Sequence, residues 1–263
     1  GMFAFALLDC KERQLFLVRD PFGIKPLYYH NNRKFFAFGS ELKALTANPF
    51  FQKEMDYSAF CDYFVYRYVP SPKTIWKNTF KVPPAHYLAY NLESGEYRLT
   101  EYWQPEIQNQ REKPEKLIHE IDDILSTSVQ SHTRADVPIG SFLSGGYDSS
   151  AIVYYLWRQQ YSAETFSIGF KDWKESEHRY AQMVAEKFGF KNHYELADEH
   201  DLGLMDVMPQ VYDEPVADIS IIPTYMVSRL ARKNVKAVMS GEGADEIFGG
   251  YTWQMDFYNR YSQ

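Results

Sequence analysis

The chain has 263 residues, of which 45% are hydrophobic and 17% aromatic, and it carries a formal net charge of −7. This length and composition predict a packed protein of one large or two modest domains, which excludes a disordered chain. The acidic balance argues against a nucleic-acid partner, and no apolar run reaches the ~18 residues needed to span a bilayer. Only two cysteines occur and no signal-peptide pattern opens the chain, so we expect a cytoplasmic protein without a disulfide framework or structural zinc site.

The first hundred residues favour antiparallel β-structure. Apolar runs bounded by turn residues predict three strands and an aromatic-faced helix, at 2–8, 14–18, 34–38 and 56–68. The stretch "AHYLAYNLESGEYRLTEYW" predicts a hairpin with "ESGE" as its turn. A polar stretch at 104–115 carries two prolines and no apolar periodicity, which makes it the candidate linker.

After this linker, strands alternate with helices. The first helix places Leu117, Ile121, Ile124 and Leu125 on one face. Strands are predicted at 137–143, 165–170, near "HYEL" and at 235–240, and helices at 148–160, 176–188, 202–212 and 220–233. In the helix at 176–188 we expect four buried side chains, Tyr180, Met183, Val184 and Phe188. The alternation predicts a parallel sheet covered on both faces.

The two ends of the chain differ from ordinary domain ends. The chain begins "GMFAFALLD", already inside a strand pattern, and closes on the aromatic-rich "YNRYSQ". Because stable domains usually end in loosely held polar residues, we expect a piece of a longer protein.

The stretch "LSGGYDSS" (143–150) lies where a predicted strand ends and a helix begins. Its glycines allow a ligand to approach the backbone, and a helix N-terminus offers N–H groups with partial positive charge. With the hydroxyls of Ser144, Ser149 and Ser150, the stretch predicts an anion nest suited to phosphates, although it is neither a Walker A loop nor G-x-G-x-x-G. The alternative is a plain turn in which Asp148 or Ser149 caps the helix.

A second stretch, "SGEGADEIFGG" (240–250), also follows a predicted strand, so its loop should lie at the same edge of the sheet. It carries Glu242, Asp245 and Glu246. Carboxylates beside a phosphate nest are repulsive unless a cation lies between them, and Mg²⁺ prefers one or two carboxylates plus phosphate oxygens. Together the two stretches predict a magnesium–nucleotide site.

The first motif, Ser144 to Ser150, resembles the pyrophosphate-binding loop of the N-type ATP pyrophosphatases. Paired with the second motif, Ser240 to Glu246, it is similar to the glutamine-hydrolysing asparagine synthetases. The stretches "GMFAFALLD", "RDPFGIKPLYY" and "FGSELKAL" resemble the second half of the class II glutamine amidotransferase domain of that family. Within "RDPFGIKP" itself we expect only a rigid turn, shaped by Asp20, Pro21 and Gly23.

This resemblance implies an α/β fold with two domains. Residues 1–107 would be the C-terminal part of an antiparallel, β-rich, Ntn-type amidotransferase domain. Residues 108–263 would be the N-terminal part of a doubly wound, parallel-sheet ATP pyrophosphatase domain. The family's nucleophilic cysteine, its glutamine-binding arginine and its Asn-Gly-Glu segment would lie upstream of Gly1, and a lysine that assists synthesis would lie beyond Gln263. The chain as written is therefore expected to bind ATP better than it turns it over.

The resemblance also implies a ligase activity. ATP activates the side-chain carboxylate of aspartate as β-aspartyl-AMP, and ammonia taken from glutamine displaces AMP to give asparagine. Pyrophosphate would be held by Ser144, Gly145, Gly146, Ser149 and Ser150. Mg²⁺ would be held by Asp148 and Asp245, ATP would also contact Leu143, Ile168, Ser240 and Gly241, and Glu242 would act as general base.

The stretch "YDEPVADISIIPTY" (212–225) resembles the family's segment beside the aspartate and ammonia site. Its substrate-side candidates are Asp213, Glu214, Asp218 and Ser220, with helix caps and a solvated acidic loop as the equal alternative. The stretch 171–178 is expected to be a flexible loop over the nucleotide. We expect His178 to be solvated and His193 to be structural.

Two departures from the family pattern affect the site. Tyr147 replaces a small or branched apolar residue, and its ring is expected either to pack under the loop or to narrow the site. Neither Cys10 nor Cys61 is a candidate nucleophile, because both fall in strand or helix patterns where a thiol is buried and inert.

Other readings stay open. The nearest is a β-lactam or carbapenam-type synthetase that adenylates another carboxylate. An RNA-modifying ATP pyrophosphatase is disfavoured by the acidic balance, and a non-catalytic ATP-binding remnant would bind ATP without adenylation. No membrane or nucleic-acid partner is expected, and a homodimer is possible because dimers occur in the family.

Overall fold

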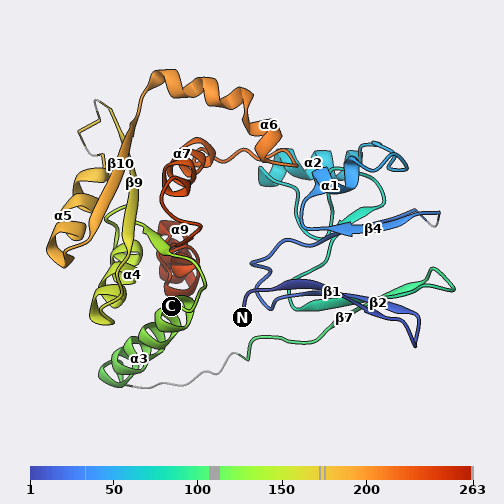
Figure 1. Cartoon of the computed structure of the whole chain (residues 1–263), viewed down its shortest axis with the longest axis horizontal. Coiled ribbons are helices and arrows are strands. Elements are labelled where there is room, and N and C mark those ends of the chain that lie inside the picture. Colours follow the sequence, from blue (N-terminus) through green and yellow to red (C-terminus); the bar gives the residue numbers. More distant parts are fainter. Residues whose placement is uncertain (33, 107–112, 172, 175, 262–263) are drawn as a thin grey trace. The chain divides into compact units, whose positions relative to one another are not determined.

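The computed structural model describes residues 1–263 except 33, 107–112, 172, 175 and 262–263 (Figure 1). It divides into two compact units. Unit 1 comprises Gly1–Asn109 and Met205–Ile219, and unit 2 comprises Gln110–Leu204 and Ser220–Gln263. Met205–Ile219 therefore lies in unit 1, although its sequence falls within the range predicted for the second domain. Part of the predicted linker lies outside the described residues.

Unit 1 is built on two antiparallel sheets. The first has the order β1-β2-β6-β7, with bounds Ala4–Asp9, Gln14–Arg19, His86–Asn91 and Tyr97–Glu101. The second has the order β4-β3-β5, with bounds Phe36–Gly39, Tyr28–Asn31 and Thr79–Lys81. The helices of this unit are α1 (Leu42–Thr46), α2 (Tyr57–Tyr66) and α6 (Met208–Val211).

The core of unit 1 is shared by its two sheets. It contains side chains that are almost wholly buried on β2, β6 and β3 and in the adjoining loops, namely Leu17, Leu88, Tyr29, Leu27 and Val82. The predicted antiparallel character, the helix near 56–68 and the hairpin are confirmed. The expected rigid turn is confirmed as well, because the wholly buried Asp20 accepts backbone N–H groups from Phe22, Ile24 and Lys25.

Unit 2 is built on one parallel sheet with the order β10-β9-β8-β11. The bounds of these strands are Lys191–Ala197, Glu164–Phe170, Ile139–Phe142 and Ala237–Met239. The helices are α3 (Pro114–His132), α4 (Tyr147–Arg158), α5 (His178–Phe188), α7 (Ile221–Arg232), α8 (Ala244–Phe248) and α9 (Thr252–Tyr261). A 3₁₀ helix spans Glu199–Asp206, where with α6 it replaces the helix predicted at 202–212.

Helices cover both faces of this sheet, as the alternation predicted (Figure 1). On one face α4 and α5 bury Val153, Ala181 and Ala185 against Leu143. On the other face α7 buries Ala231 beside Phe166 of β9. Unit 2 is thus a three-layer arrangement with the sheet in the middle.

Two expected helix faces are corrected by the structure. In α5, Tyr180 and Met183 are 58% and 64% exposed, and the buried face is made by alanines. Two small residues let α5 lie close to its neighbours, so the larger side chains one position before and two positions after Ala181 point elsewhere. In α3, Ile124 is 66% exposed, and the buried residue is Val129.

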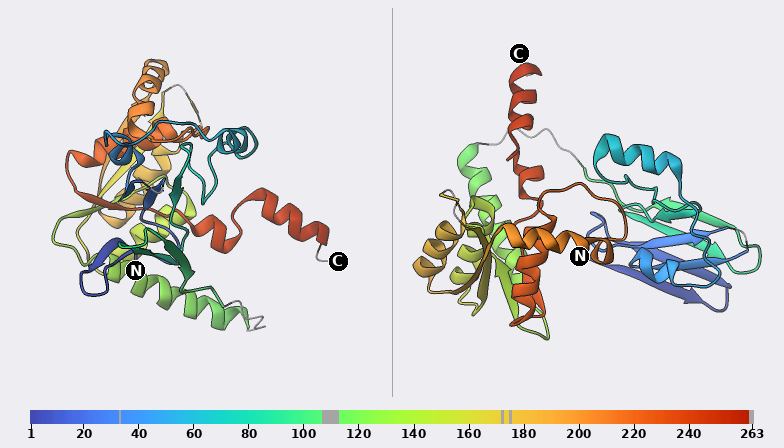
Figure 2. Two further views of the ribbon diagram at one scale, coloured as in Figure 1. Left: turned by 90° about the vertical axis from the view of Figure 1, so that its right-hand side faces the viewer. Right: turned by 90° about the horizontal axis from the view of Figure 1, so that it is seen from above.

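The last helix, α9, projects away from the sheet of unit 2 and buries none of its residues (Figure 2). Both cysteines are exposed free thiols, which corrects the expectation that they are buried: Cys10 lies in the turn after β1, and Cys61 lies on the outer side of α2. Among the described residues, no helix is both long and apolar enough to cross a membrane.

Candidate functional site

The two glycine-rich motifs of unit 2 follow neighbouring strands. β11 pairs in parallel with β8, with Met239 opposite Ser141. The chain leaves β8 through the buried Leu143 into the first motif and α4, and leaves β11 at Ser240 into the second motif and α8. The prediction that both loops lie at one edge of the sheet is confirmed, and this carboxyl edge is where parallel sheets bind ligands.

The two loops are in contact through Gly241. A Cβ atom at this position would lie 2.8 Å from Asp148 Cβ and 2.9 Å from Ser149 N. Real Cβ atoms do not approach other atoms so closely, so only glycine fits here without moving the first turn of α4. Glycine at 241 therefore keeps the second loop directly against the start of α4.

The adjacent glycines of the first motif have different functions. Gly145 has a φ of +89°, and a Cβ there would lie 2.5 Å from Tyr180 Cβ and 2.6 Å from Ala181 N. The close approach of α5 thus excludes any side chain at position 145, without reference to a ligand. Gly146 has a φ of −70°, and its Cβ would meet only Ser144 Oγ, at 3.3 Å. Gly146 is therefore the position where the backbone stays open.

Two serines of the first motif form hydrogen bonds within the loop, and the hydroxyl of the third is unpaired. Ser149 Oγ accepts the N–H of Ser144 at 3.2 Å and lies 3.0 Å from Ser144 Oγ, which in turn accepts the N–H of Gly146 at 3.2 Å. Ser150 Oγ is buried and has no hydrogen-bond partner among the described residues. Since an unpaired buried hydroxyl costs free energy, this atom fits a ligand that supplies an acceptor.

The start of α4 has no side-chain cap. Gly146 is its N-cap residue, and neither Asp148 nor Ser149 caps the helix, so the cap expected in the plain-turn alternative is wrong. The first-turn N–H groups of a twelve-residue helix, with the positive end of its dipole, favour an anion.

The carboxylates lie on both loops. Asp148 is in the first turn of α4, Asp245 is in the first turn of α8, and Glu242 is exposed between β11 and α8. Within the described ranges, no three His, Cys, Asp or Glu side chains gather as a metal site.

The remaining nucleotide-side candidates lie in or beside the sheet. Leu143 is 1% exposed and donates its N–H to Phe166 O at 2.9 Å, and Ile168 is half-buried in β9. Tyr147 is 96% exposed, so the expectation that its ring packs under the loop is wrong.

Asp213 and Glu214, the acidic pair of the stretch 212–225, lie in unit 1. Asp213 is ion-paired with Lys43, and Glu214 with Lys81, with side-chain exposures of 15% and 14% for the two carboxylates. A solvated loop is therefore wrong for this pair. Asp218 and Ser220 are exposed, and Ser220 is the N-cap residue of α7. Sequence reasoning missed both lysines. Lys43 lies in the stretch "FGSELKAL", which was used only for the family resemblance, and Lys81 lies in none of the quoted stretches.

The two histidines near the site are both packed. His178 Nδ1 lies 2.7 Å from Ser176 Oγ and its ring stacks on Tyr194, which corrects the expectation of a solvated side chain. The stretch 171–178 around it lies partly outside the described residues. His193 is structural, as predicted, because it bonds Glu164 at 2.9 Å and stacks on Phe166.

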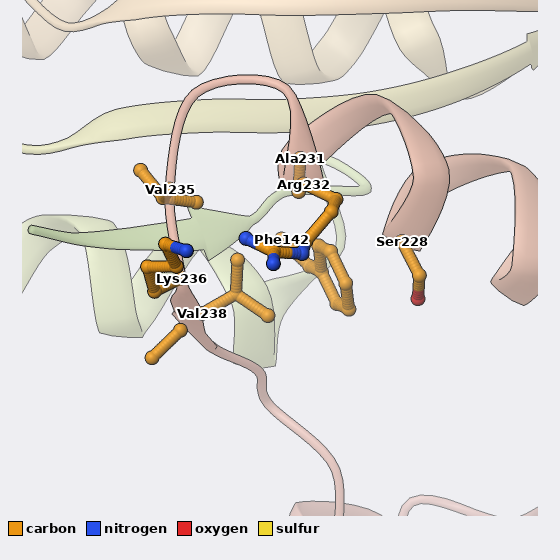
Figure 3. Close-up of a pocket in the computed structure, with 8 residues that line it drawn as sticks. Phe142, Ser228, Ala231, Arg232, Val235, Lys236 and Val238 are labelled. Carbon is orange, nitrogen blue, oxygen red and sulfur yellow. The ribbon is translucent and has the colours of Figure 1, made fainter.

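A cavity of about 220 Å³ lies away from these loops, where α7 ends and β11 begins (Figure 3). Its lining includes Phe142, Val235, Val238, Arg232 and Lys236. It holds none of the predicted site residues.

Two family models match the chain. The family model described as asparagine synthase matches residues 120–262, and that of the glutamine amidotransferase domain matches residues 1–103. The chain is 39% identical over 98% of its length to a putative glutamine-hydrolysing asparagine synthetase 2 of Methanocaldococcus jannaschii, of which it covers 51%. It is 37% identical over 95% of its length to glutamine-hydrolysing asparagine synthetase 1 of Bacillus subtilis, of which it covers 40%.

A putative glutamine-hydrolysing asparagine synthetase of Mycobacterium bovis gives 39% identity, over 96% of this chain and 40% of the relative. The chain thus spans about half or less of the length of these relatives. The asparagine synthase model covers the unit that carries both loops, and it extends over more than half of the chain. The chain belongs to the asparagine synthase family.

Proposed function

We propose that this chain is part of a glutamine-dependent asparagine synthetase, which amidates aspartate with ATP through β-aspartyl-AMP. The observation that carries the proposal is the contact of Gly241 with Asp148 and Ser149, beside the unpartnered hydroxyl of Ser150. An anion-binding helix start and a carboxylate-bearing loop meet there, as adenylation of a carboxylate by magnesium-bound ATP requires.

The proposed chemistry follows from the weakness of a carboxylate as acyl donor. A carboxylate oxygen of aspartate attacks the α-phosphorus of ATP, and the bond to pyrophosphate breaks. Ammonia then attacks the acyl carbon, and AMP leaves with the attacking oxygen. The first-turn N–H groups of α4 and the hydroxyls of Ser144, Ser149 and Ser150 stabilise the charge that develops on the departing pyrophosphate.

Magnesium fits the donor set, because Asp148 and Asp245 are the two carboxylates that it needs beside phosphate oxygens. When bound, it would neutralise charge on the phosphates. ATP would also contact Leu143, Ile168, Ser240 and Gly241. Glu242, exposed after β11, is the proposed general base that takes a proton from the incoming ammonia.

The finer fold assignments belong to the same proposal. Unit 2 would be a doubly wound ATP pyrophosphatase domain and the N-terminal residues part of an Ntn-type amidotransferase domain, with the boundary near residue 107. Two free thiols fit a reducing compartment, so we place the protein in the cytoplasm. A homodimer stays a prediction, which sedimentation tests.

The proposal is tested by aspartate-dependent release of pyrophosphate from Mg-ATP, using the protein with its native flanking sequences. Ammonia and glutamine are supplied in parallel, with Asp148→Ala as the inactive variant and Asp123→Ala, an exposed carboxylate of α3, as the matched control. We expect release with aspartate that only Asp148→Ala abolishes. ATP binding without aspartate-dependent release would contradict the proposal and point to another carboxylate or to a non-catalytic remnant.

A further inference from the structure

Part of the asparagine synthase sequence folds onto the other unit. The asparagine synthase match covers residues 120–262 without interruption, yet Met205–Ile219 belongs to the compact unit formed by Gly1–Asn109. The chain leaves unit 2 after Leu204 and returns to it at Ser220, one residue before α7 begins. We call Met205–Ile219 the docked segment.

Glu214 of the docked segment is bonded through both of its carboxylate oxygens. Its Oε2 lies 2.7 Å from Lys81 Nζ on β5, and its Oε1 accepts the N–H of Ile75 at 2.9 Å. Lys81 Nζ also donates to Val69 O at 2.6 Å. The two side chains are 16% and 14% exposed. Both charges are thus buried, paired and supplied with further hydrogen bonds, which is the condition for a buried ion pair to be tolerated.

Asp213 adds a second ionic contact on a different element. Its Oδ2 accepts the backbone N–H of Lys43 in α1 at 3.2 Å, and its Oδ1 lies 3.3 Å from Lys43 Nζ. The same ammonium donates to the carbonyls of Gln210 and Val211 at 3.3 Å. Lys43 therefore contacts both the end of α6 and Asp213, two residues beyond it.

A third contact closes the set. The N–H of Ala217 donates to the carbonyl of Arg67 at 2.8 Å, at the left-handed residue that ends α2. Burial raises the pKa of Tyr28, together with the charges of Glu214 and Asp213, to about 12. Tyr28 lies opposite Lys81 in the β3–β5 pair, so the carboxylates lie close to the sheet itself. The docked segment is held by α1, α2 and β5.

Such bonding is costly as a way to gain stability, because desolvation cancels much of the attraction in a buried ion pair. Its physical advantage is geometric. Two charged pairs fix one position of the docked segment along unit 1, whereas an apolar contact would permit several. The segment is continuous with unit 2, because the chain runs from Ile219 through Ser220 into α7, whose Ala231 packs beside Phe166 of β9.

We propose that Lys43 and Lys81 are positioning residues that couple glutamine hydrolysis to asparagine synthesis, by holding Asp213 and Glu214 of the docked segment. This inference rests on the proposed function. Ammonia released by an amidotransferase domain reaches the acyl-adenylate only while glutamine hydrolysis and asparagine synthesis are coupled. The docked segment is the stretch of the asparagine synthase sequence that belongs to unit 1. The acidic pair then serves the coupling and does not contact aspartate.

The test measures asparagine formed per glutamate released, and separately the rate with ammonia, in the protein with its native flanking sequences. Lys81→Met removes the buried charge at similar length, Lys81→Arg keeps it, and Lys43→Met removes the half-exposed partner. Lys77→Met is the matched control, because Lys77 forms an exposed ion pair with Glu54 in the same unit.

We expect Lys81→Met to lower the ratio of asparagine to glutamate about tenfold, which is less than the ~10²-fold loss that a misplacement of about 1 Å can cause. Glutamate release and the ammonia-supported rate should stay within about twofold of the wild type. Lys43→Met should lower the ratio less, and Lys81→Arg and Lys77→Met should keep it. The inference would be overturned if the ratio were unchanged in both Lys43→Met and Lys81→Met. It would also be overturned if, in both variants, the ammonia-supported rate fell by the same factor as the ratio.

Failure of the proposed function gives a different signature, namely no asparagine from the wild type with either nitrogen source. The docking is then judged by hydrogen exchange of residues 205–219. Faster exchange in Lys81→Met than in Lys77→Met supports the anchoring, and equal exchange overturns it.

Discussion

Ser150 carries a buried hydroxyl without a partner in the first turn of α4. Because its cost is incurred only while no ligand is bound, Ser150→Ala should leave the free energy of unfolding unchanged or slightly higher, and should weaken ATP binding by about 1–2 kcal/mol. Urea unfolding and calorimetric titration with Mg-ATP measure the two quantities. Parallel losses of stability and binding would show instead that the hydroxyl is structural.

Asp20 is a residue whose bonding is structural throughout. Its carboxylate accepts three N–H groups at 2.9–3.2 Å in the turn that follows β2. In Asp20→Asn one oxygen becomes a donor that faces an N–H, so we expect unit 1 to lose about 2 kcal/mol of unfolding free energy. Denaturant unfolding measures this loss, and a change below about 0.5 kcal/mol, typical of surface sites, would contradict it.

The same carboxyl predicts a pH effect. Burial alone raises the pKa of Asp20, but the N–H groups of Lys25, Ile24 and Phe22 hold it below the ordinary value of 3.8. A lowered folded pKa gives stability that is present above pH 3.8 and is lost as the pH falls through the folded value. The difference in unfolding free energy between wild type and Asp20→Asn should therefore shrink below pH 3.8 and stay constant above about pH 5. A difference that is constant from pH 2 to pH 7 would exclude this cause.

Among the elements, the packing of α5 against the first loop gives the adjacent Gly145 and Gly146 different expected responses to substitution. Gly145→Ala combines a φ of +89° with a Cβ only 2.5 Å from Tyr180 Cβ, so unit 2 should lose about 2–4 kcal/mol of unfolding free energy. Gly146→Ala has a permitted φ and no atom nearer than 3.3 Å, so its stability should change by less than about 1 kcal/mol.

The same pair differs in ATP binding. Gly146→Ala should weaken it although the fold is kept, because the added methyl group occupies the open side of the loop. Thermal unfolding and ATP titration of both variants test this difference. Equal destabilisation by the two alanines would contradict the distinct functions of the glycines.

The sequence allowed most elements of unit 2 to be predicted, since its strands are apolar runs bounded by turns and its helices are periodic. The edge shared by the two loops was also predictable, because both motifs follow strands. The faces of α5 were not predictable from hydrophobicity, since the close approach that buries Ala181 and excludes Tyr180 depends on the partner helix. β3 and β5 were missed because four and three residues are too few to show a period.

At the scale of the whole molecule, the docked segment was beyond prediction from the sequence. Its bonds join residues far apart in the chain: Ile75 and Glu214 are separated by 139 positions, and Lys43 and Asp213 by 170. A local pattern carries no sign of such a partner. The stretch 212–225 was therefore interpreted by resemblance alone, as a substrate-side segment.

The fate of the carboxylate oxygen tests the proposal that the two apposed loops of unit 2 direct aspartate to the α-phosphorus of ATP. Aspartate labelled with ¹⁸O in its side-chain carboxylate is incubated with Mg-ATP and ammonia, using the protein with its native flanking sequences, and AMP and inorganic phosphate are analysed by mass spectrometry. We expect one labelled oxygen in AMP for each asparagine formed, and none in inorganic phosphate. Label in inorganic phosphate, which indicates attack at the γ-phosphorus, or asparagine without labelled AMP would contradict it.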